Sequence, residues 1–336
     1  MSVQLASRRR ITSSDVARAA GVSRTTVSYV LNNTAHQKIP EDTRQRVVDA
    51  AARLAYAPSA AARALRIGRT DTVLFLLPDW PISPAISALV EHLALAVAAD
   101  GLMLVVHPHV RASQSLPDIC KATTPAAVVG ISDFTREETT AMRAAGIKTV
   151  VSLAGRTGRA RHFGARGDHV GRVQAEHLLA AGHRRLGYAL PENERVQTIA
   201  STRLEGVDLA CRERGLAEPL VLRFPLDPAA AAESVRTWLD AEPPVTGVCC
   251  FNDNVALAVL AGLRTLGLRA PGDLAVIGVD DIEAARLADP PLTTVTTDMH
   301  ALANHVAETI ATSLNGGSRS RRAGAELVHL IRRCSA

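Results

Sequence analysis

The chain has 336 residues, 47% hydrophobic and 21% charged, a length that suits a small module joined to a larger two-lobed one better than a single ordinary domain. The formal net charge is +5, but residues 1–70 alone hold 12 Lys and Arg against 4 Asp and Glu. The basic excess is therefore confined to the N-terminal fifth, which favours a module that contacts the phosphates of nucleic acid.

The cysteines and the apolar segments exclude several classes of protein. Five cysteines are scattered without a CxxC pair, which argues against a disulfide framework and a zinc site. We expect no metal and no cofactor. The chain begins without an apolar signal segment, and no 18-residue apolar stretch is free of charge. We therefore expect a soluble, cytoplasmic protein with no membrane partner.

Residues 12–31 predict two short helices joined by a tight turn. Thr12 can cap the first helix, and Asp15, three residues later, can complete a capping box. Gly21 stands where a helix end needs a positive φ, and Ser23 can cap a second helix.

The second helix, residues 24–31, has Val27, Val30 and Leu31 at the three- and four-residue spacing of a buried face. Two helices joined in this way match a helix-turn-helix, whose second helix lies in the major groove of DNA. On spacing alone, an ordinary helical hairpin is the alternative, and the local basic excess favours DNA. The residues left facing outward are Arg24, Thr25, Ser28, Tyr29 and Asn32.

A third helix is predicted from Glu41 to about Leu54, with Val47, Val48, Ala51 and Leu54 as its apolar stripe. It would cover the first two helices and complete a three-helix head.

Residues 59–68 form a short Ala-rich segment that is too short to hold a helix alone in water. It is therefore a linker that could fold on binding. Leu65 could then act as an apolar wedge in the minor groove of DNA, and a plain linker is the alternative.

Beyond residue 72, short apolar runs alternate with helical stretches, a pattern typical of parallel sheets covered on both faces. Eight strands over this length favour two Rossmann-like lobes, and no GxGxxG dinucleotide motif occurs. The predicted strands are residues 72–77, 102–107, 126–131, 148–153, 186–190, 220–224, 247–251 and 274–279.

Polar residues follow several of these strands, where ligands of such sheets bind. Asp79 and Trp80 follow the first strand, Asn252 follows the seventh, and Asp280 follows the eighth, while Arg203 lies in a later helical segment. Together they could hold a hydroxylated or charged small molecule. The alternatives are that the aspartates cap helices and that Trp80 is a contact between lobes.

Several motifs resemble the LacI/GalR family of bacterial transcription regulators. They are ITSSDVARAAGVSRTTVSYVLNN and TRQRVVDAAARLAYAPSAAARALRIGRTDTVLFLLPD in the first 79 residues, followed by AEHLLAAGHRRLGY (175–188), RLEG (203–206), FNDNVALAVL (251–260), GLRAPGDLAVIGVDD (267–281) and PPLTTV (290–295). The resemblance covers essentially the whole chain in order.

The resemblance implies an all-α helix-turn-helix head at residues 1–57, a hinge helix or linker at 58–70, and an α/β core at 71–336. The core would resemble periplasmic binding proteins, with an N-lobe of about 71–165 and 296–325 and a C-lobe of about 166–295 and 326–336.

The same resemblance implies roles for particular residues. Arg24 and Thr25 would read bases, with Ser28 and Tyr29 one turn on, and Tyr29 departs from an arginine that is common in the family. Leu65 would enter the minor groove beside the small Ala62, and Ser59 stands where asparagine is usual. Arg203, Asn252 and Asp280 match effector-binding positions, and Asp168 is a further candidate. The predicted DNA-binding set is Thr12, Ser23, Arg24, Thr25, Ser28, Tyr29, Asn32, Ala62 and Leu65, and the effector-binding set is Asp79, Trp80, Asp168, Arg203, Asn252 and Asp280.

The expected function is therefore that of a transcriptional repressor that binds a near-palindromic operator as a homodimer and responds to a small effector, such as a sugar, between its lobes. An enzyme is disfavoured because no GxSxG, HExxH or P-loop occurs. A transport-type solute-binding protein is the remaining alternative, since its lobes would look the same, but it would not need a basic head.

Overall fold

The computed structural model of the protein describes residues 11–31, 38–57, 64, 68–109, 115–153, 161–162, 167–317 and 325–336. The chain divides into two compact units, Met1–Thr70 and Asp71–Ala336. In the described ranges, no helix has the length and apolar character needed to cross a membrane.

The first unit contains the three predicted helices, α1 (Ser13–Ala20), α2 (Arg24–Leu31) and α3 (Glu41–Arg53). At the start of α1 the capping box is confirmed, because the Asp15 carboxylate accepts hydrogen bonds from the Thr12 backbone N–H at 2.9 Å and from its hydroxyl at 2.7 Å. Gly21 ends α1 with a φ of 66°, in the left-handed conformation that glycine adopts without steric penalty.

A small apolar core joins these three helices. Its buried members in the described part of the head are Val16, Ala17, Ala20, Val27, Val30, Val47, Ala50 and Ala51. The prediction that Val48 belongs to this core is wrong, since its side chain is 44% exposed. The buried stripe runs from Val47 at intervals of three and four residues, and Val48 lies one residue off that stripe.

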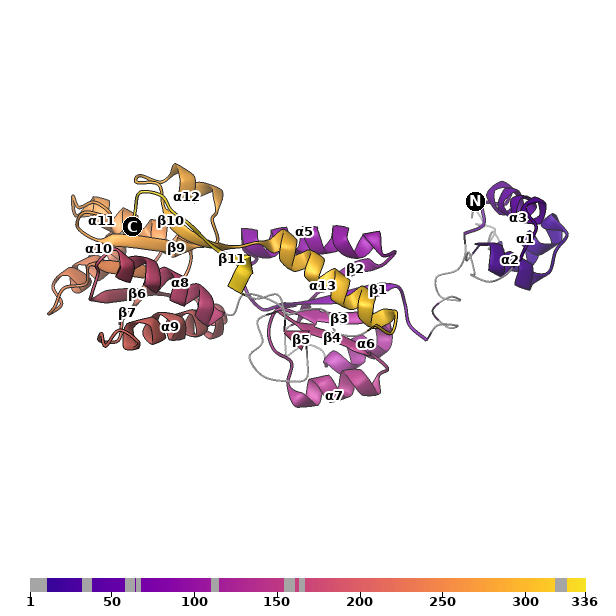
Figure 1. Ribbon diagram of the computed structural model, residues 1–336, viewed down its shortest axis with the longest axis horizontal. Helices are drawn as coiled ribbons and strands as arrows, with labels where there is room; N and C mark the ends of the chain where they lie inside the picture. Colours follow the sequence, from indigo (N-terminus) through magenta and orange to yellow (C-terminus); the bar gives the residue numbers. More distant parts are fainter. Residues whose placement is uncertain are drawn as a thin grey trace, which may run out of the picture. The chain divides into compact units, whose positions relative to one another are not determined.

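The second unit contains two sheets, each the centre of one lobe (Figure 1). The N-lobe sheet is wholly parallel with the strand order β2-β1-β3-β4-β5, and the C-lobe sheet has the order β11-β10-β9-β8-β6-β7. In the C-lobe, β11 pairs antiparallel with β10 and the other pairs are parallel. The two-lobed α/β class expected from the sequence is confirmed.

Their bounds are β1 (Thr72–Pro78), β2 (Met103–His109), β3 (Ala127–Gly130), β4 (Thr149–Ser152), β5 (Arg161–His162), β6 (Leu186–Pro191), β7 (Leu220–Phe224), β8 (Gly247–Cys250), β9 (Ala275–Val279), β10 (Thr293–Thr297) and β11 (Val328–Ile331). All eight predicted strands are present, whereas the sequence reading missed β5, β10 and β11. β10 is rich in threonine and β5 has two residues, so neither forms the continuous apolar run that marks a buried parallel strand.

Helices cover both faces of each sheet. In the N-lobe they are α5 (Pro84–Ala99), α6 (Leu116–Thr123), α7 (Arg136–Ala144) and α13 (Met299–Leu314). In the C-lobe they are α8 (Gly167–Ala180), α9 (Gln197–Arg212), α10 (Pro228–Leu239), α11 (Asp253–Thr265) and α12 (Glu283–Leu287), with short 3₁₀ turns η1 (Glu194–Val196) in this lobe and η2 (Ala325–Leu327) before β11.

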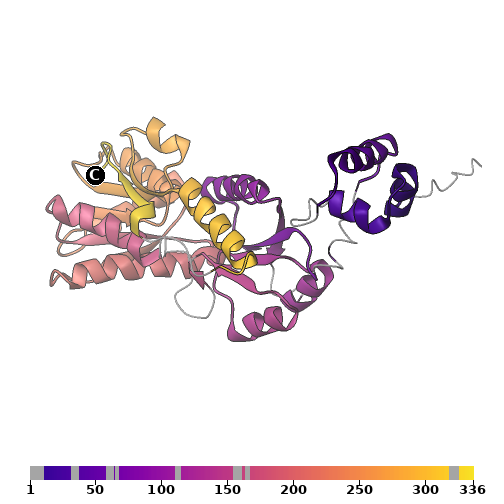
Figure 2. The ribbon, with the colours of Figure 1, turned by 45° about the vertical axis from the view of Figure 1, so that its right-hand side comes forward.

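The chain passes between the lobes more than once. Figures 1 and 2 show α13, which follows β10 of the C-lobe, lying beside α5 in the N-lobe. Leu302, Val306 and Ile310 of α13 are buried in the N-lobe core. The chain then returns to the C-lobe as β11. These crossings connect the two lobes into one unit.

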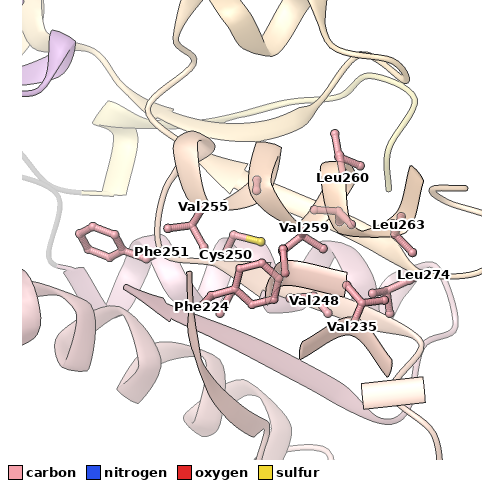
Figure 3. Packing of buried hydrophobic residues seen from close by; sticks show 14 of the residues in the cluster. Phe224, Val235, Val248, Cys250, Phe251, Val255, Val259, Leu260, Leu263 and Leu274 are labelled. Carbon is pink, nitrogen blue, oxygen red and sulfur yellow. The ribbon is translucent and has the colours of Figure 1, made fainter. Parts of the chain in front are cut away.

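The C-lobe core packs around the carboxyl ends of β7 and β8. A cluster of buried residues from β7, β8, α10 and α11 packs around Phe224 (Figure 3). The Phe224 ring stacks on that of Trp238, with 5.3 Å between the ring centroids. Phe251 lies at one end of this cluster, directly after β8.

Two glycines allow α8 and α9 to cross in backbone contact. A Cβ at Gly206 would lie 1.8 Å from the Asp168 carbonyl oxygen, and a Cβ at Gly171 would lie 1.8 Å from the Arg203 carbonyl oxygen. No side chain fits at either distance. This crossing therefore fixes the part of α9 that carries Arg203 against α8.

We expect Gly206→Ala to lower the free energy of unfolding by about 1–3 kcal/mol or more, because the added methyl group must push the helices apart. Gly272→Ala is the matched control, since the nearest atom to its Cβ is 4.0 Å away. Its effect should stay within about 0.5 kcal/mol. Urea unfolding followed by circular dichroism measures both, and equal stabilities would contradict the crossing as described.

Candidate functional site

The outward face of α2 is built by its capping and its buried residues. The Ser23 hydroxyl oxygen accepts a hydrogen bond from the Thr26 backbone N–H at 3.0 Å, which satisfies a free donor of the first turn. Val27 and Val30 are buried in the head core, so the helix has one fixed orientation in the unit.

The structure places six of the predicted DNA-binding residues on or beside this face. Thr12, Ser23, Arg24 and Thr25 are exposed, while Ser28 and Tyr29 are partly buried. The other three, Asn32, Ala62 and Leu65, lie outside the described residues. Exposed Arg24 and Thr25 at the N-terminal end of α2 have the placement of base-contacting residues in a helix-turn-helix.

A cavity of about 730 Å³ lies in the second unit and is lined by residues of both lobes. Its size falls in the range of about 300–1,000 Å³ that is usual for small-molecule sites. Four predicted effector-binding residues line it: Trp80, Arg203, Asn252 and Asp280. Three of these come from the C-lobe, and Trp80 follows β1 of the N-lobe.

Arg203 has a largely buried guanidinium group, with 11% of its side chain exposed. Its Nη1 donates a short hydrogen bond to the Phe251 carbonyl oxygen, and its Nη2 lies 3.7 Å from an Asp280 carboxylate oxygen. The guanidinium carbon is 4.8 Å from the centre of the Phe251 ring, a cation–π distance. Arg203 Nε is buried and has no hydrogen-bond partner among the described residues.

Asp280 is the acidic partner of Arg203 in the cavity. Its backbone has a φ of 109°, which is rare for a residue with a side chain, and its N–H donates to the Val295 carbonyl oxygen at 2.8 Å. Burial raises the pKa of this carboxyl group, and the charge of Arg203 acts in the opposite direction. A strained backbone and a desolvated carboxylate together are features that recur at functional sites.

Asn252 caps α11, a role that the sequence analysis considered for the aspartates alone, and it also lines the cavity. Its Oδ1 accepts a hydrogen bond from the Val255 N–H at 3.1 Å. Because the oxygen serves the cap, the NH₂ group of the side chain is the part that suits a ligand.

Trp80 has the position expected of a ligand-binding residue and also that expected of a contact between lobes. It lines the cavity and packs against the cores of both lobes. Asp79 and Asp168 are not among the cavity-lining residues. Asp79 instead pairs with Arg195 of the other lobe, with 3.2 Å between Oδ1 and Nη1, and Asp168 accepts a hydrogen bond from the His169 N–H at 3.0 Å.

The sequence reading missed several residues of the cavity wall. They include Ile82, Ser132, Asp133, Phe224, Leu226 and Phe251. Phe251 could have been noticed because it begins the motif that contains Asn252, whereas no sequence pattern marks Ile82 or Leu226. The described residues contain no group of three or more His, Cys, Asp or Glu side chains placed to hold a metal.

The comparisons with known proteins agree with this two-part arrangement. A family model described as "Bacterial regulatory proteins, lacI family" matches residues 12–59, and one described as "Periplasmic binding protein-like domain" matches residues 175–336. The HTH-type transcriptional repressor PurR of Haemophilus influenzae is 30% identical over 290 residues, which cover 84% of each chain. The chain belongs to the LacI family.

Solved structures resemble this LacI-family chain along nearly its whole length. A complex of the transcriptional regulator CelR with cellobiose is 26% identical, with a TM-score of 0.65 over 97% of this chain and 100% of that one. A lac repressor dimer bound to operator and the anti-inducer ONPF is 22% identical, with a TM-score of 0.75 over 97% and 99% of the two chains, and it supports the fold. The LacI-family chain is thus a DNA-binding transcriptional regulator with an effector-binding domain.

Asp253, which follows the cavity-lining Asn252, links the start of α11 to β10 and to the segment before α12. Asp253 is fully buried, and its two carboxylate oxygens accept hydrogen bonds from the Thr294 hydroxyl at 2.6 Å and from the Ile282 N–H at 2.9 Å. Burial raises the pKa of this carboxyl group to about 7, although both hydrogen bonds act to lower it.

Between the ordinary pKa of an aspartate and about 7, the Asp253 carboxyl group keeps its proton in the folded chain and loses it in the unfolded chain. The contribution of Asp253 to stability is therefore greatest below its unfolded pKa and falls as the pH rises toward about 7. We expect Asp253→Asn to flatten the decline in the free energy of unfolding between about pH 4 and pH 7. Urea unfolding of both proteins across this range measures it, and parallel curves would contradict the assignment.

Proposed function

We propose that this LacI-family chain is a repressor that binds a near-palindromic operator as a homodimer in the cytoplasm, and that a small effector between its lobes controls its affinity for DNA. One observation carries the proposal: a single chain holds both a basic head whose second helix exposes Arg24 and Thr25 and a cavity lined by two lobes. We assign the head to residues 1–57, the hinge to 58–70 and the core to 71–336.

The head would bind DNA through the face of α2. Arg24 and Thr25 are exposed at its N-terminal end, and Ser28 and Tyr29 follow one turn later. An arginine at such a position donates two hydrogen bonds to guanine in the major groove. In the same proposal, Asn32 continues this face, while Leu65 and Ala62 of the hinge contact the minor groove.

The effector would bind through the polar groups of the C-lobe. Arg203 and the Asn252 amide are donors, and the Asp280 carboxylate is an acceptor, a combination that suits the hydroxyl groups of a sugar or a sugar derivative. Trp80 would contact the effector from the N-lobe. Asp79 and Asp168, which were also predicted to bind the effector, would lie beside the cavity and not in its wall. An effector can change the affinity for DNA only if it binds one arrangement of the lobes more tightly than the other, and the ratio of these two affinities limits the change.

We expect Arg24→Ala to weaken binding to the operator by about 1–3 kcal/mol if Arg24 reads a base. Fluorescence anisotropy with operator DNA and with random duplex measures this, with operator first selected from a random library. Arg53→Ala, which removes an exposed arginine of α3, is the charge-matched control. Equal losses on operator and random DNA would make Arg24 a phosphate contact instead.

We expect Arg203→Ala to remove the effect of the effector on operator binding while leaving binding without effector within about twofold, since Arg203 lies in the core unit. Arg264→Ala, an exposed arginine of α11 that does not line the cavity, should keep the response. Thermal-shift screening of sugars and their derivatives supplies the ligand. A response that survives Arg203→Ala would contradict the proposed site.

A further inference from the structure

The pairing of β8 with β9 ends before the two strands reach the cavity. Their last paired residues are Cys249 and Ile277, and the cavity-lining Asn252 and Asp280 each come three positions later. At this point each strand is still bonded to its outer neighbour, because the Phe251 N–H donates to β6 and the Asp280 N–H donates to β10. The distance between the ends of β8 and β9 is therefore set by something other than their own ladder.

The side chain of Gln174 on α8 bonds to the ends of both strands. It is fully buried, and its Nε2 donates to the Cys250 carbonyl oxygen of β8 at 2.9 Å. The same nitrogen lies 3.1 and 3.2 Å from the Gly278 and Ile277 carbonyl oxygens of β9. Carbonyl oxygens around one atom identify it as the NH₂ group, because the amide oxygen would be repelled there. One side chain thus joins the two strands where their ladder has ended.

The other end of this amide shows that packing does not account for it. Gln174 Oε1 is buried and has no hydrogen-bond partner within the described ranges. A buried acceptor without a partner is unfavourable, and an apolar side chain of similar size would avoid that cost. Such a side chain would donate to neither strand. The bonds to β8 and β9 therefore explain an amide at this position better than packing does.

α8 also supports the residue that lies between these strand ends and the ligand space. Gly171, one turn before Gln174, lies so close to α9 that a Cβ there would be 1.8 Å from the Arg203 carbonyl oxygen. The helix therefore contacts the backbone of Arg203 at one turn and the ends of β8 and β9 at the next. The three residues to which the proposed function assigns the polar contacts of the effector, Arg203, Asn252 and Asp280, share α8 as a common support.

We infer that Gln174 is a positioning residue of the effector cavity, because it fixes the distance between the ends of β8 and β9 and so the places of Asn252 and Asp280 in the cavity wall. The inference rests on the proposed function for the identity of the cavity. Gln174 does not line the cavity, so it acts through these two residues and not by contact with a ligand.

Hydrogen exchange of the full chain, followed by mass spectrometry, tests this without a ligand. Both strand ends are followed by hydrogen-bonded amides, among them those of Val255 and Ile282. In Gln174→Met the side chain keeps roughly its size and loses its donors. Residues 251–255 and 279–282 should then exchange about tenfold or more faster, since amides exchange when their local hydrogen bonds open.

Thr149→Val is the matched control in the N-lobe. The buried Thr149 hydroxyl donates to the Ser313 hydroxyl at 2.7 Å, and neither residue lines the cavity. Exchange of residues 251–255 and 279–282 should stay within about twofold of the unchanged protein. Unchanged exchange in Gln174→Met would overturn the inference. A rise of equal size in β6 and α10 would overturn it too, because that is the result for a residue that only stabilises the fold.

A second variant, Gln174→Glu, separates the donors from the volume. Its carboxyl group has one donor while protonated and none once ionised, and burial among carbonyl oxygens favours the protonated form. At about pH 5, exchange at both strand ends should lie within about threefold of the unchanged protein, and the difference should grow toward about pH 8. Comparison at the same pH cancels the titration of Asp253 and Asp280. A rise at pH 5 as large as that of Gln174→Met would contradict a role for the donors.

The exchange experiment uses neither ligand nor DNA, so its failure is distinguishable from that of the proposed function. If operator binding is sequence-specific but Gln174→Met leaves exchange unchanged, the inference fails and the regulator assignment stands. If exchange rises at the two strand ends but the chain prefers no DNA sequence, Gln174 still positions the cavity wall and the proposed function fails.

Discussion

The buried guanidinium group of Arg203 is the constraint on which the proposed effector site depends. A buried charge is unfavourable unless it is paired and hydrogen-bonded, and this one has the Phe251 carbonyl oxygen, the Asp280 carboxylate at 3.7 Å and the Phe251 ring. Those partners come from the ends of two neighbouring strands, and the glycine crossing of α8 and α9 holds the backbone of Arg203 in place. Within the described part of the chain Arg203 Nε has no hydrogen-bond partner, which leaves one more donor for a ligand to satisfy.

The head obeys a simpler constraint, because its core is small. Buried valines and alanines hold its three helices together, so the orientation of α2 depends on Val27 and Val30. Capping by Thr12 with Asp15 and by Ser23 fixes the helix ends on which this packing relies. In the proposed function, this fixed orientation of α2 keeps Arg24 and Thr25 on the face that contacts DNA.

Features set by local chemistry could be predicted from the sequence. The bounds of α1 and α2 follow from caps and from three- and four-residue spacing, and the buried parallel strands are continuous apolar runs. Other features depend on contacts between distant residues. The antiparallel pairing of β11 with β10 and the ion pair of Asp79 with Arg195, 116 positions away, leave no local pattern. Ile82 and Leu226 escaped notice because only the folded lobes bring them to one cavity.

We propose that this chain couples the cavity between its lobes to a DNA-binding head. The most direct measurement is calorimetric titration of a stabilising ligand into the chain alone and into its complex with operator. Thermodynamic linkage requires the operator to change the ligand's dissociation constant by the same factor by which the ligand changes that of the operator, about 5- to 150-fold in typical cases. Equal, non-unit factors are the predicted result, and a ligand whose affinity is indifferent to operator would contradict the claim.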